Sequence, residues 1–212
     1  MTHRVVAVTA GLSVPSSTRL LTDRLVGALE SQMGNRGESV EVEVVELREH
    51  AQAIASHLTS GFASGPLAHV IDRVETADAL IVVTPVFAAS YSGLFKSFVD
   101  LIDPDALDGT PVLVAATAGT ARHSLVLEHA MRPLFSYLHA VVLPTGVFAA
   151  TDDFAGDDLG HRIERAAAEL ADALVGRGDR AAGFRPGRTE RELSLDDVPS
   201  FRSLLGDQAR RS

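Results

Sequence analysis

The sequence contains no cysteine among its 212 residues. Disulfide bonds, thiol nucleophiles and iron–sulfur clusters are therefore excluded, and a zinc site would have to use histidine and carboxylate ligands. Basic residues are also few, because 19 lysines and arginines stand against 28 aspartates and glutamates, for a net charge of −9. Without a basic excess to release counterions, we expect no general affinity for nucleic acid or for anionic membranes.

Long apolar stretches are missing as well. The apolar runs are too short to cross a bilayer, and the first six residues lack the apolar core of a signal peptide. We therefore expect a cytoplasmic protein. The length and the apolar content of 46% suit one large domain, which we place at residues 1–176. Residues 177–212, rich in Gly, Arg, Asp and Pro, are predicted to form an extended or flexible tail, or an arm that packs on a neighbouring subunit.

Five predicted strands alternate with helical patterns along the chain. The strands are expected at 5–9, 40–47, 79–83, 111–116 and 141–147, and the helices near 20–33, 67–76, 94–102, 124–138 and 159–175. The wholly apolar run at 79–83 suits a central strand, whereas the alternating pattern at 40–47 suits an edge strand. Residues 50–66 show no clean period and are predicted to be a long loop with one helical turn at most. This order predicts an α/β fold with a flavodoxin-like, doubly wound, five-stranded parallel sheet and helices on both faces.

Three polar loops follow three of these strands, at residues 10–19, 84–93 and 117–123. In a parallel sheet the loops after the strands meet at one edge, so we expect them to form one site. Hydroxyls at Ser16, Ser17 and Thr18 stand at a helix start, where they can either cap the helix or hold a phosphate. Small residues such as Gly119 would let a flat ring approach the backbone. The three loops together suit a phosphorylated planar cofactor.

Motifs of other chemistries are missing. The first loop carries neither a Walker sequence nor Gly-x-Gly-x-x-Gly, and the chain has no Gly-x-Ser-x-Gly elbow and no paired acid and base. His50, His57 and His69 lack metal-ligand spacing, so we expect no metal site. Flavin chemistry needs none of these groups, because hydride passes directly between stacked rings. We therefore predict no catalytic side chain.

The three loops resemble those of the NAD(P)H-dependent FMN reductases, in particular the small reductases that serve luciferase-like or alkanesulfonate monooxygenases. The resemblance runs from about Val5 to about Phe154, and the stretch from Thr84 to Lys96 is its most specific part. It implies an enzyme that transfers hydride from NADPH or NADH to FMN. It also implies a two-component system, in which a separate flavin-dependent monooxygenase uses the reduced FMN with oxygen.

The resemblance also implies which residues bind FMN. The phosphate would be held by Ser13, Ser16, Ser17 and Thr18. The isoalloxazine ring would be lined by Pro85, Val86, Phe87 and Ala88. Its other edge would meet Thr117, Gly119, Thr120 and His123. Many relatives have Tyr at Phe87, Lys at Ala88 and Arg at Val14, and a longer first loop, so we expect FMN to be held loosely here, as a substrate.

His129 lies where relatives that exchange flavin carry a Tyr or His, often in a helix with an inserted residue at a subunit interface. It is therefore a candidate for an interface or flavin-exchange role, with an ordinary surface histidine as the alternative. The resemblance implies a homodimer or homotetramer built on the helices after Gly93 and His123.

Two other functions suit the same loops. One is an NAD(P)H:quinone or azo reductase that retains its FMN, since it needs the same flavin cradle. The other is a non-catalytic flavin-binding module that only docks to a partner, because a fold alone does not establish a reaction.

Overall fold

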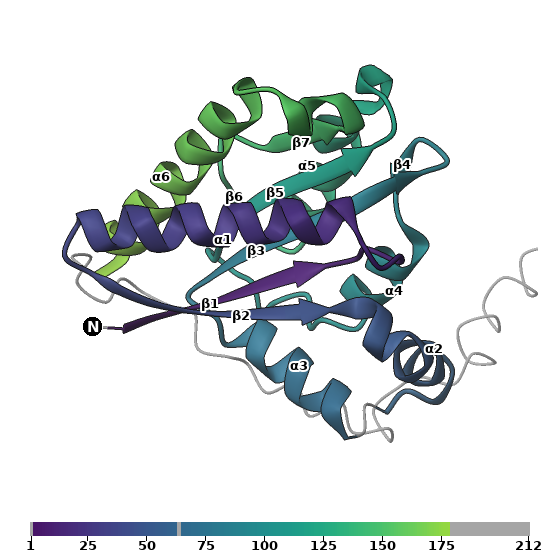
Figure 1. Cartoon of the computed structure of the whole chain (residues 1–212). Coiled ribbons are helices and arrows are strands. Elements are labelled where there is room, and N and C mark those ends of the chain that lie inside the picture. The colour runs from purple at the N-terminus through teal and green to yellow at the C-terminus, as the bar shows by residue number, and fades with distance from the viewer. Residues whose placement is uncertain (1, 63–64, 179–212) are drawn as a thin grey trace, which may run out of the picture. The chain divides into compact units, whose positions relative to one another are not determined.

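The computed structural model describes residues 2–62 and 65–178 and shows one sheet between two layers of helices (Figure 1). The strands of these residues are β1 (Thr2–Thr9), β2 (Ser39–Glu46), β3 (Ala79–Phe87), β4 (Ser90–Tyr91), β5 (Pro111–Ala118), β6 (Val141–Val142) and β7 (Val147–Ala150). The α-helices are α1 (Ser17–Asn35), α2 (Ala51–Ser60), α3 (Pro66–Glu75), α4 (Gly93–Val99), α5 (Arg132–Tyr137) and α6 (Asp158–Gly178). Shorter helical segments are the 3₁₀ turns η1 (Leu47–His50), η2 (Ala121–His123) and η4 (Thr151–Ala155) and the π-helical η3 (Leu127–Met131).

The strand order is β2-β1-β3-β5-β6, with β7 also paired to β5 and with every one of these pairs parallel. This is the flavodoxin-like order that the sequence predicts, with β3 in the centre and the alternating strand β2 at the edge. The number of strands differs, because the described residues form seven strands and not five. One addition is β4, which folds back antiparallel on the end of β3.

The other addition comes from the fifth predicted strand, which is two short strands. Val141 and Val142 pair with the start of β5, and Val147 resumes the pairing further along the same strand. Pro144 lies between them and has no backbone N–H to donate, so the ladder is interrupted there. At Gly146 the chain passes so close to β5 that an added Cβ would lie 3.2 Å from the Val114 carbonyl oxygen.

Most side chains of the inner strands β1, β3 and β5 are buried, on both faces of the sheet. Along β1, Val6 and Val8 belong to one apolar core, whereas Val5 and Ala7 belong to the other. The first core is covered by α2, α3, α4 and α5, and the second by α1 and α6 (Figure 1). The prediction of helices on both faces is confirmed, and it explains why these strands lack polar alternation.

The predicted loop at 50–66 is wrong over most of its length, because residues 51–60 form α2. This helix buries one large side chain, Ile54, in the core. It ends at Gly61, which adopts the left-handed conformation with φ 76° and donates its N–H to the His57 carbonyl. Because only one large side chain of this ten-residue helix is buried, its sequence shows no clear helical spacing of apolar residues, and the pattern did not indicate a helix.

The helix predicted at 124–138 is two segments. The π-helical η3 comes first and α5 follows it, so Pro133 is the second residue of α5. Proline is tolerated in a first helical turn because its missing N–H would have no partner there. The predicted tail at 177–212 lies outside the described residues except for 177 and 178, the last two positions of α6. Within residues 2–62 and 65–178, no helix is long and apolar enough to cross a membrane.

Candidate functional site

Parallel pairing brings the three polar loops to the carboxyl edge of the sheet. Thr9 near the end of β1 pairs with Val83 of β3, and Pro85 of β3 pairs with Thr117 of β5. The Ala10 N–H then donates to the Val83 carbonyl at 2.9 Å, so the first loop leaves the sheet beside the second. The chain segments after β1, β3 and β5 therefore lie next to one another, as the sequence predicts (Figure 1).

The first loop folds tightly over the start of α1. A Cβ added to Gly11 would lie 2.1 Å from the Ser16 hydroxyl oxygen, so only glycine fits this approach. The Ser16 hydroxyl accepts the Arg19 N–H at 3.2 Å, which is the capping role that the sequence left open. Ser13 and Ser17 are exposed, and the first turn of α1 contains no acidic residue. Exposed hydroxyls at the positive end of a 19-residue helix favour an anion.

Thr18, in contrast, is buried. Its hydroxyl oxygen lies 2.8 Å from that of Thr117, and the two residues are 2% and 3% exposed. The structure thus brings together two residues that the sequence assigned to opposite ends of one cofactor. Their hydroxyls contact each other and not the open surface.

The second loop is a β-hairpin. Val86 pairs with Tyr91, and a two-residue turn at Ala88 and Ala89 reverses the chain. Both alanines have positive φ, 47° and 64°, which type I′ turns require and which Asn and Gly usually supply. Each alanine in this region is strained by roughly 1 kcal/mol. Phe87 lies in this hairpin at the edge of the candidate site, and the residue is 48% exposed.

Two buried hydroxyls that the sequence does not single out fasten this hairpin. The Thr84 hydroxyl accepts the Ser92 N–H at 3.0 Å and donates to the Pro85 carbonyl at 3.0 Å. The Ser92 hydroxyl in turn accepts the Phe95 N–H at 3.1 Å and caps α4. Ser92 directly precedes a glycine and an apolar helical stretch, and that capping position is the one signal that could have identified it.

The third loop is open. Gly119, Thr120 and His123 are all exposed, and Arg122 lies beside them. A Cβ added to Gly119 would meet no atom within 4 Å, and its φ is not positive. Neither packing nor backbone conformation within the described protein therefore requires glycine here, which leaves room for a flat ligand above the loop.

Arg19, in the first turn of α1, is already paired. Its guanidinium bonds the Asp23 carboxylate at 2.8 Å and also contacts Glu46, whose other oxygen accepts from Arg48 at 2.6 Å. Burial raises the pKa of Glu46, but the hydrogen bonds and charges of Arg48 and Arg19 lower it more, so the pKa lies below its ordinary value of 4.5. The hydrogen bond to Asp23, ahead of the contact with Glu46, raises the pKa of Arg19. These groups anchor the start of α1 to the end of β2.

His129 lies exposed in the π-helical η3. A π turn accommodates one extra residue, so this backbone is compatible with the inserted residue that the resemblance implies. Among the described residues no group of three or more His, Asp or Glu is placed to hold a metal ion.

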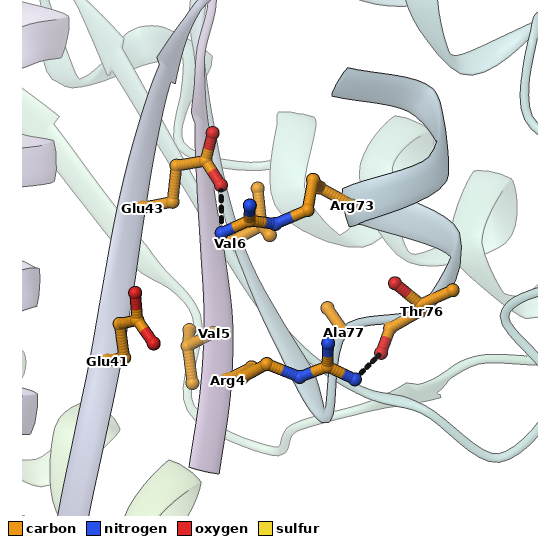
Figure 2. A pocket seen from close by; sticks show the side chains of 8 residues that line it. All are labelled: Arg4, Val5, Val6, Glu41, Glu43, Arg73, Thr76 and Ala77. Carbon is orange, nitrogen blue, oxygen red and sulfur yellow. Dashed lines mark hydrogen bonds and ion pairs between the residues drawn. The ribbon is translucent and has the colours of Figure 1, made fainter. Parts of the chain in front are cut away.

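A hollow at the other end of the sheet is not part of this edge. It is lined by Arg4, Val5, Val6, Glu41, Glu43, Arg73, Thr76 and Ala77 (Figure 2). These residues belong to β1 and β2, to α3 and to the turn that leads into β3. None of them is a residue for which the sequence predicts a function.

Comparison with known proteins identifies relatives along most of the chain. A family model described as NADPH-dependent FMN reductase matches residues 3–155. A Pseudomonas aeruginosa protein named FMN reductase (NADPH) is 42% identical over 183 residues, which cover 83% of this chain and 95% of that protein. The NADH-dependent FMN reductase SfnF of Pseudomonas fluorescens is also 42% identical, over 82% of this chain and 92% of that protein. Among solved structures, an oxidoreductase from Corynebacterium diphtheriae superimposes with a TM-score of 0.80 at 47% identity, covering 82% of this chain and 98% of that chain.

Proposed function

Because the chain belongs to the NADPH-dependent FMN reductase family, and is thus an oxidoreductase that uses FMN with NADPH or NADH, we propose that it releases reduced FMN to a separate flavin-dependent monooxygenase. The observation that carries this proposal is the carboxyl edge of the sheet. There the start of α1, whose first turn has no acidic residue, lies beside the hairpin that exposes Phe87 and the open loop of Gly119. This arrangement fits a phosphate followed by a flat ring.

The phosphate end of FMN fits the first loop. We assign it to the exposed hydroxyls of Ser13 and Ser17 and to the backbone N–H groups at the start of α1. Ser16 shapes this cradle, because its hydroxyl caps the helix and Gly11 packs against it. Thr18 would support the first loop from the protein interior without contacting the phosphate, because the residue is buried.

The ring end fits the other two loops. Pro85, Val86, Phe87 and Ala88 would line one side of the isoalloxazine. Gly119, Thr120 and His123 would line the other, above the buried Thr117. When bound, FMN supplies the ring that accepts hydride from the nicotinamide, so the residues of this chain orient two flat rings and exclude water from between them. No side chain is needed to move a proton in that step.

Loose binding of FMN would make it a substrate of this enzyme. The hairpin presents Ala88 where many relatives have a cation, and the loop presents Val14, which is exposed, where many have an arginine. A flavin held by hydroxyls and backbone groups, without a charged partner, dissociates more easily. The rival function, a reductase that retains FMN and reduces quinones or azo dyes, predicts the opposite.

We further propose that His129 and η3 contribute to a subunit interface in a homodimer or homotetramer. The π turn places an exposed imidazole on the helical segment that the resemblance assigns to that interface. We also propose a cytoplasmic location, in keeping with the absence of cysteine.

The test is nicotinamide oxidation by purified protein in air, with NADPH and NADH in turn, with and without added FMN. The proposal expects colourless protein whose turnover requires added FMN, and whose product flavin supports a flavin-dependent monooxygenase kept behind a dialysis membrane under low oxygen. Yellow protein that keeps stoichiometric FMN through dialysis and turns over only with a quinone or dye would establish the rival function.

A further inference from the structure

The contact between Thr18 and Thr117 joins two parts of the site that lie 99 residues apart in the chain. Their hydroxyl oxygens are 2.8 Å apart, and both residues are almost completely buried. A buried hydroxyl pair of this kind is stable because one hydroxyl donates a hydrogen bond to the other, so both oxygens have a partner away from water. Neither oxygen faces the surface where a ligand would lie.

Each threonine belongs to a different loop of the site. Thr18 is the second residue of α1, directly after the exposed Ser17. It supports the first loop from below, since a Cβ on Gly11 would lie 3.2 Å from the Thr18 Cβ. Thr117 is the next-to-last residue of β5, and the open loop of Gly119 begins two residues later. The pair therefore links the start of α1 to the base of the third loop across the intervening strand β3.

We propose that Thr18 and Thr117 are positioning residues, a hydroxyl clasp through which the two ends of the flavin site are held in register. This rests on the proposed assignment of FMN to these loops. The clasp keeps the start of α1 ordered relative to the ring loop before the flavin arrives, so that a phosphate bound at α1 places the ring correctly. Pre-ordering of this kind lowers the entropy that binding must overcome.

The clasp makes a prediction that a direct ligand contact does not. Thr117→Val removes a hydroxyl at the ring end, yet it should weaken recognition of the phosphate end. We expect the dissociation constant of FMN to rise by roughly five- to tenfold, the range of one net hydrogen bond. Riboflavin, which lacks the phosphate, should change by less than about twofold. Selectivity for FMN over riboflavin is therefore the quantity to measure.

The experiment is a fluorescence titration of the full chain with FMN and with riboflavin, for the wild type and for variants at both positions. Thr117→Ser and Thr18→Ser keep a hydroxyl and should restore most of the selectivity. The matched control is Thr22→Val, because Thr22 is also a wholly buried threonine of α1 but donates to the Thr18 carbonyl within the helix at 2.9 Å. It should lower stability without changing selectivity.

The double variant separates positioning from stability. Each single Val variant leaves one buried hydroxyl without a partner, so each should melt at a lower temperature, and the double variant should recover because no orphaned group remains. Selectivity should not recover, because the clasp is absent in all three variants. Equal loss of selectivity in the two single variants and the double variant is the signature of one shared contact.

Two outcomes would overturn the clasp. If Thr117→Val weakens FMN and riboflavin equally, Thr117 contacts the ring directly. If selectivity stays at the wild-type value in every variant, the pair is only structural. Wild-type protein that binds no flavin at all would contradict the proposed function instead, so the two failures can be told apart.

Discussion

The two ends of the sheet are built with different chemistry. At the amino end, charged side chains line the hollow of Figure 2: the Arg73 guanidinium contacts the Glu43 carboxylate at 2.7 Å, and the Arg4 guanidinium donates to the Thr76 carbonyl at 3.4 Å. At the carboxyl end, neutral hydroxyls fasten the three polar loops, through the Thr18–Thr117 pair and through Thr84, which accepts from the backbone of Ser92. Charged groups also lie beside these loops at the end of β2, where Glu46 contacts Arg19 and Arg48.

This difference indicates which end can bind an anionic cofactor. Charges that already have partners gain little from a ligand and must first be separated from each other. The hydroxyls add no negative charge, and the nearby Glu46 carboxylate is already held by Arg19 and Arg48, so the positive end of α1 stays available. The visible hollow and the functional edge therefore need not coincide, and substitutions at each end should have separable effects.

The largest effect should come from Gly11→Ala at the carboxyl end. The new Cβ would displace the Ser16 hydroxyl, so the loop is overpacked and α1 loses its cap, at a cost of roughly 2–4 kcal/mol in the free energy of unfolding. FMN titration should show weaker binding as well. The control is Gly27→Ala in the middle of α1, where a Cβ meets nothing, and there urea unfolding should show a gain of about 0.5–1 kcal/mol. Equal effects at the two glycines would remove the argument for a tight phosphate loop.

The next effect should come from Thr84→Val. Thr84 is fully buried, and the substitution leaves the Ser92 N–H without its acceptor, which should cost about 1–3 kcal/mol in urea unfolding. The hairpin would also lose its hold on Phe87, so the Michaelis constant for FMN should rise. Thr84→Ser keeps the acceptor and should be close to wild type. A wild-type Michaelis constant in Thr84→Val would mean that the hairpin does not depend on this hydroxyl.

A smaller and pH-dependent effect is expected for Glu46→Gln. Because the pKa of Glu46 is lower in the folded protein than its ordinary 4.5, its contribution to stability is fully present above that value and is lost as the pH falls through the folded-state pKa. The variant should be about 1–2 kcal/mol less stable at neutral pH, and the difference should shrink below roughly pH 4.5. Glu49→Gln, at a weaker and more exposed contact with Arg48, is the control. A difference that stays constant down to pH 3 would contradict the assignment.

The smallest effect should follow from Arg73→Met at the amino end. The ion pair with Glu43 is partly exposed, with side chains 46% and 37% accessible, so solvent screening should leave a change below about 1 kcal/mol. FMN affinity and turnover should equal those of the wild type. A clear loss of FMN binding in this variant would show that the hollow of Figure 2 belongs to the site after all.

Much of the fold could be predicted from local pattern. The apolar runs at 79–83 and 111–116 correspond to the buried strands β3 and β5, and the alternating stretch at 40–47 corresponds to the edge strand β2. These predictions succeeded because burial on one or two faces imposes a period on the sequence. The π turn at His129 and the helix α2 could not be read with confidence, because a single inserted residue or a single buried anchor leaves almost no period.

The site divides in the same way. Hydroxyls and small residues after three of the strands were enough to predict a binding edge, and the resemblance named the residues around it. The Ala88–Ala89 turn was missed, because alanines with positive φ carry none of the Asn or Gly signals of a hairpin. Ser16 could not be assigned to capping over phosphate binding until its contact with the Arg19 N–H was known.

The sequence by itself determined the α/β class and the edge at which the three polar loops gather, because both follow from the alternation of short strand and helix patterns along the chain. Only the tertiary structure decided that the Thr18 hydroxyl contacts that of Thr117, that the Thr84 hydroxyl accepts the Ser92 N–H, and that Arg73 at the amino end pairs with Glu43. Such contacts join residues that are distant along the chain, and their partners depend on the register and packing of the whole sheet. The spacing of apolar and polar residues within one segment therefore does not predict these contacts.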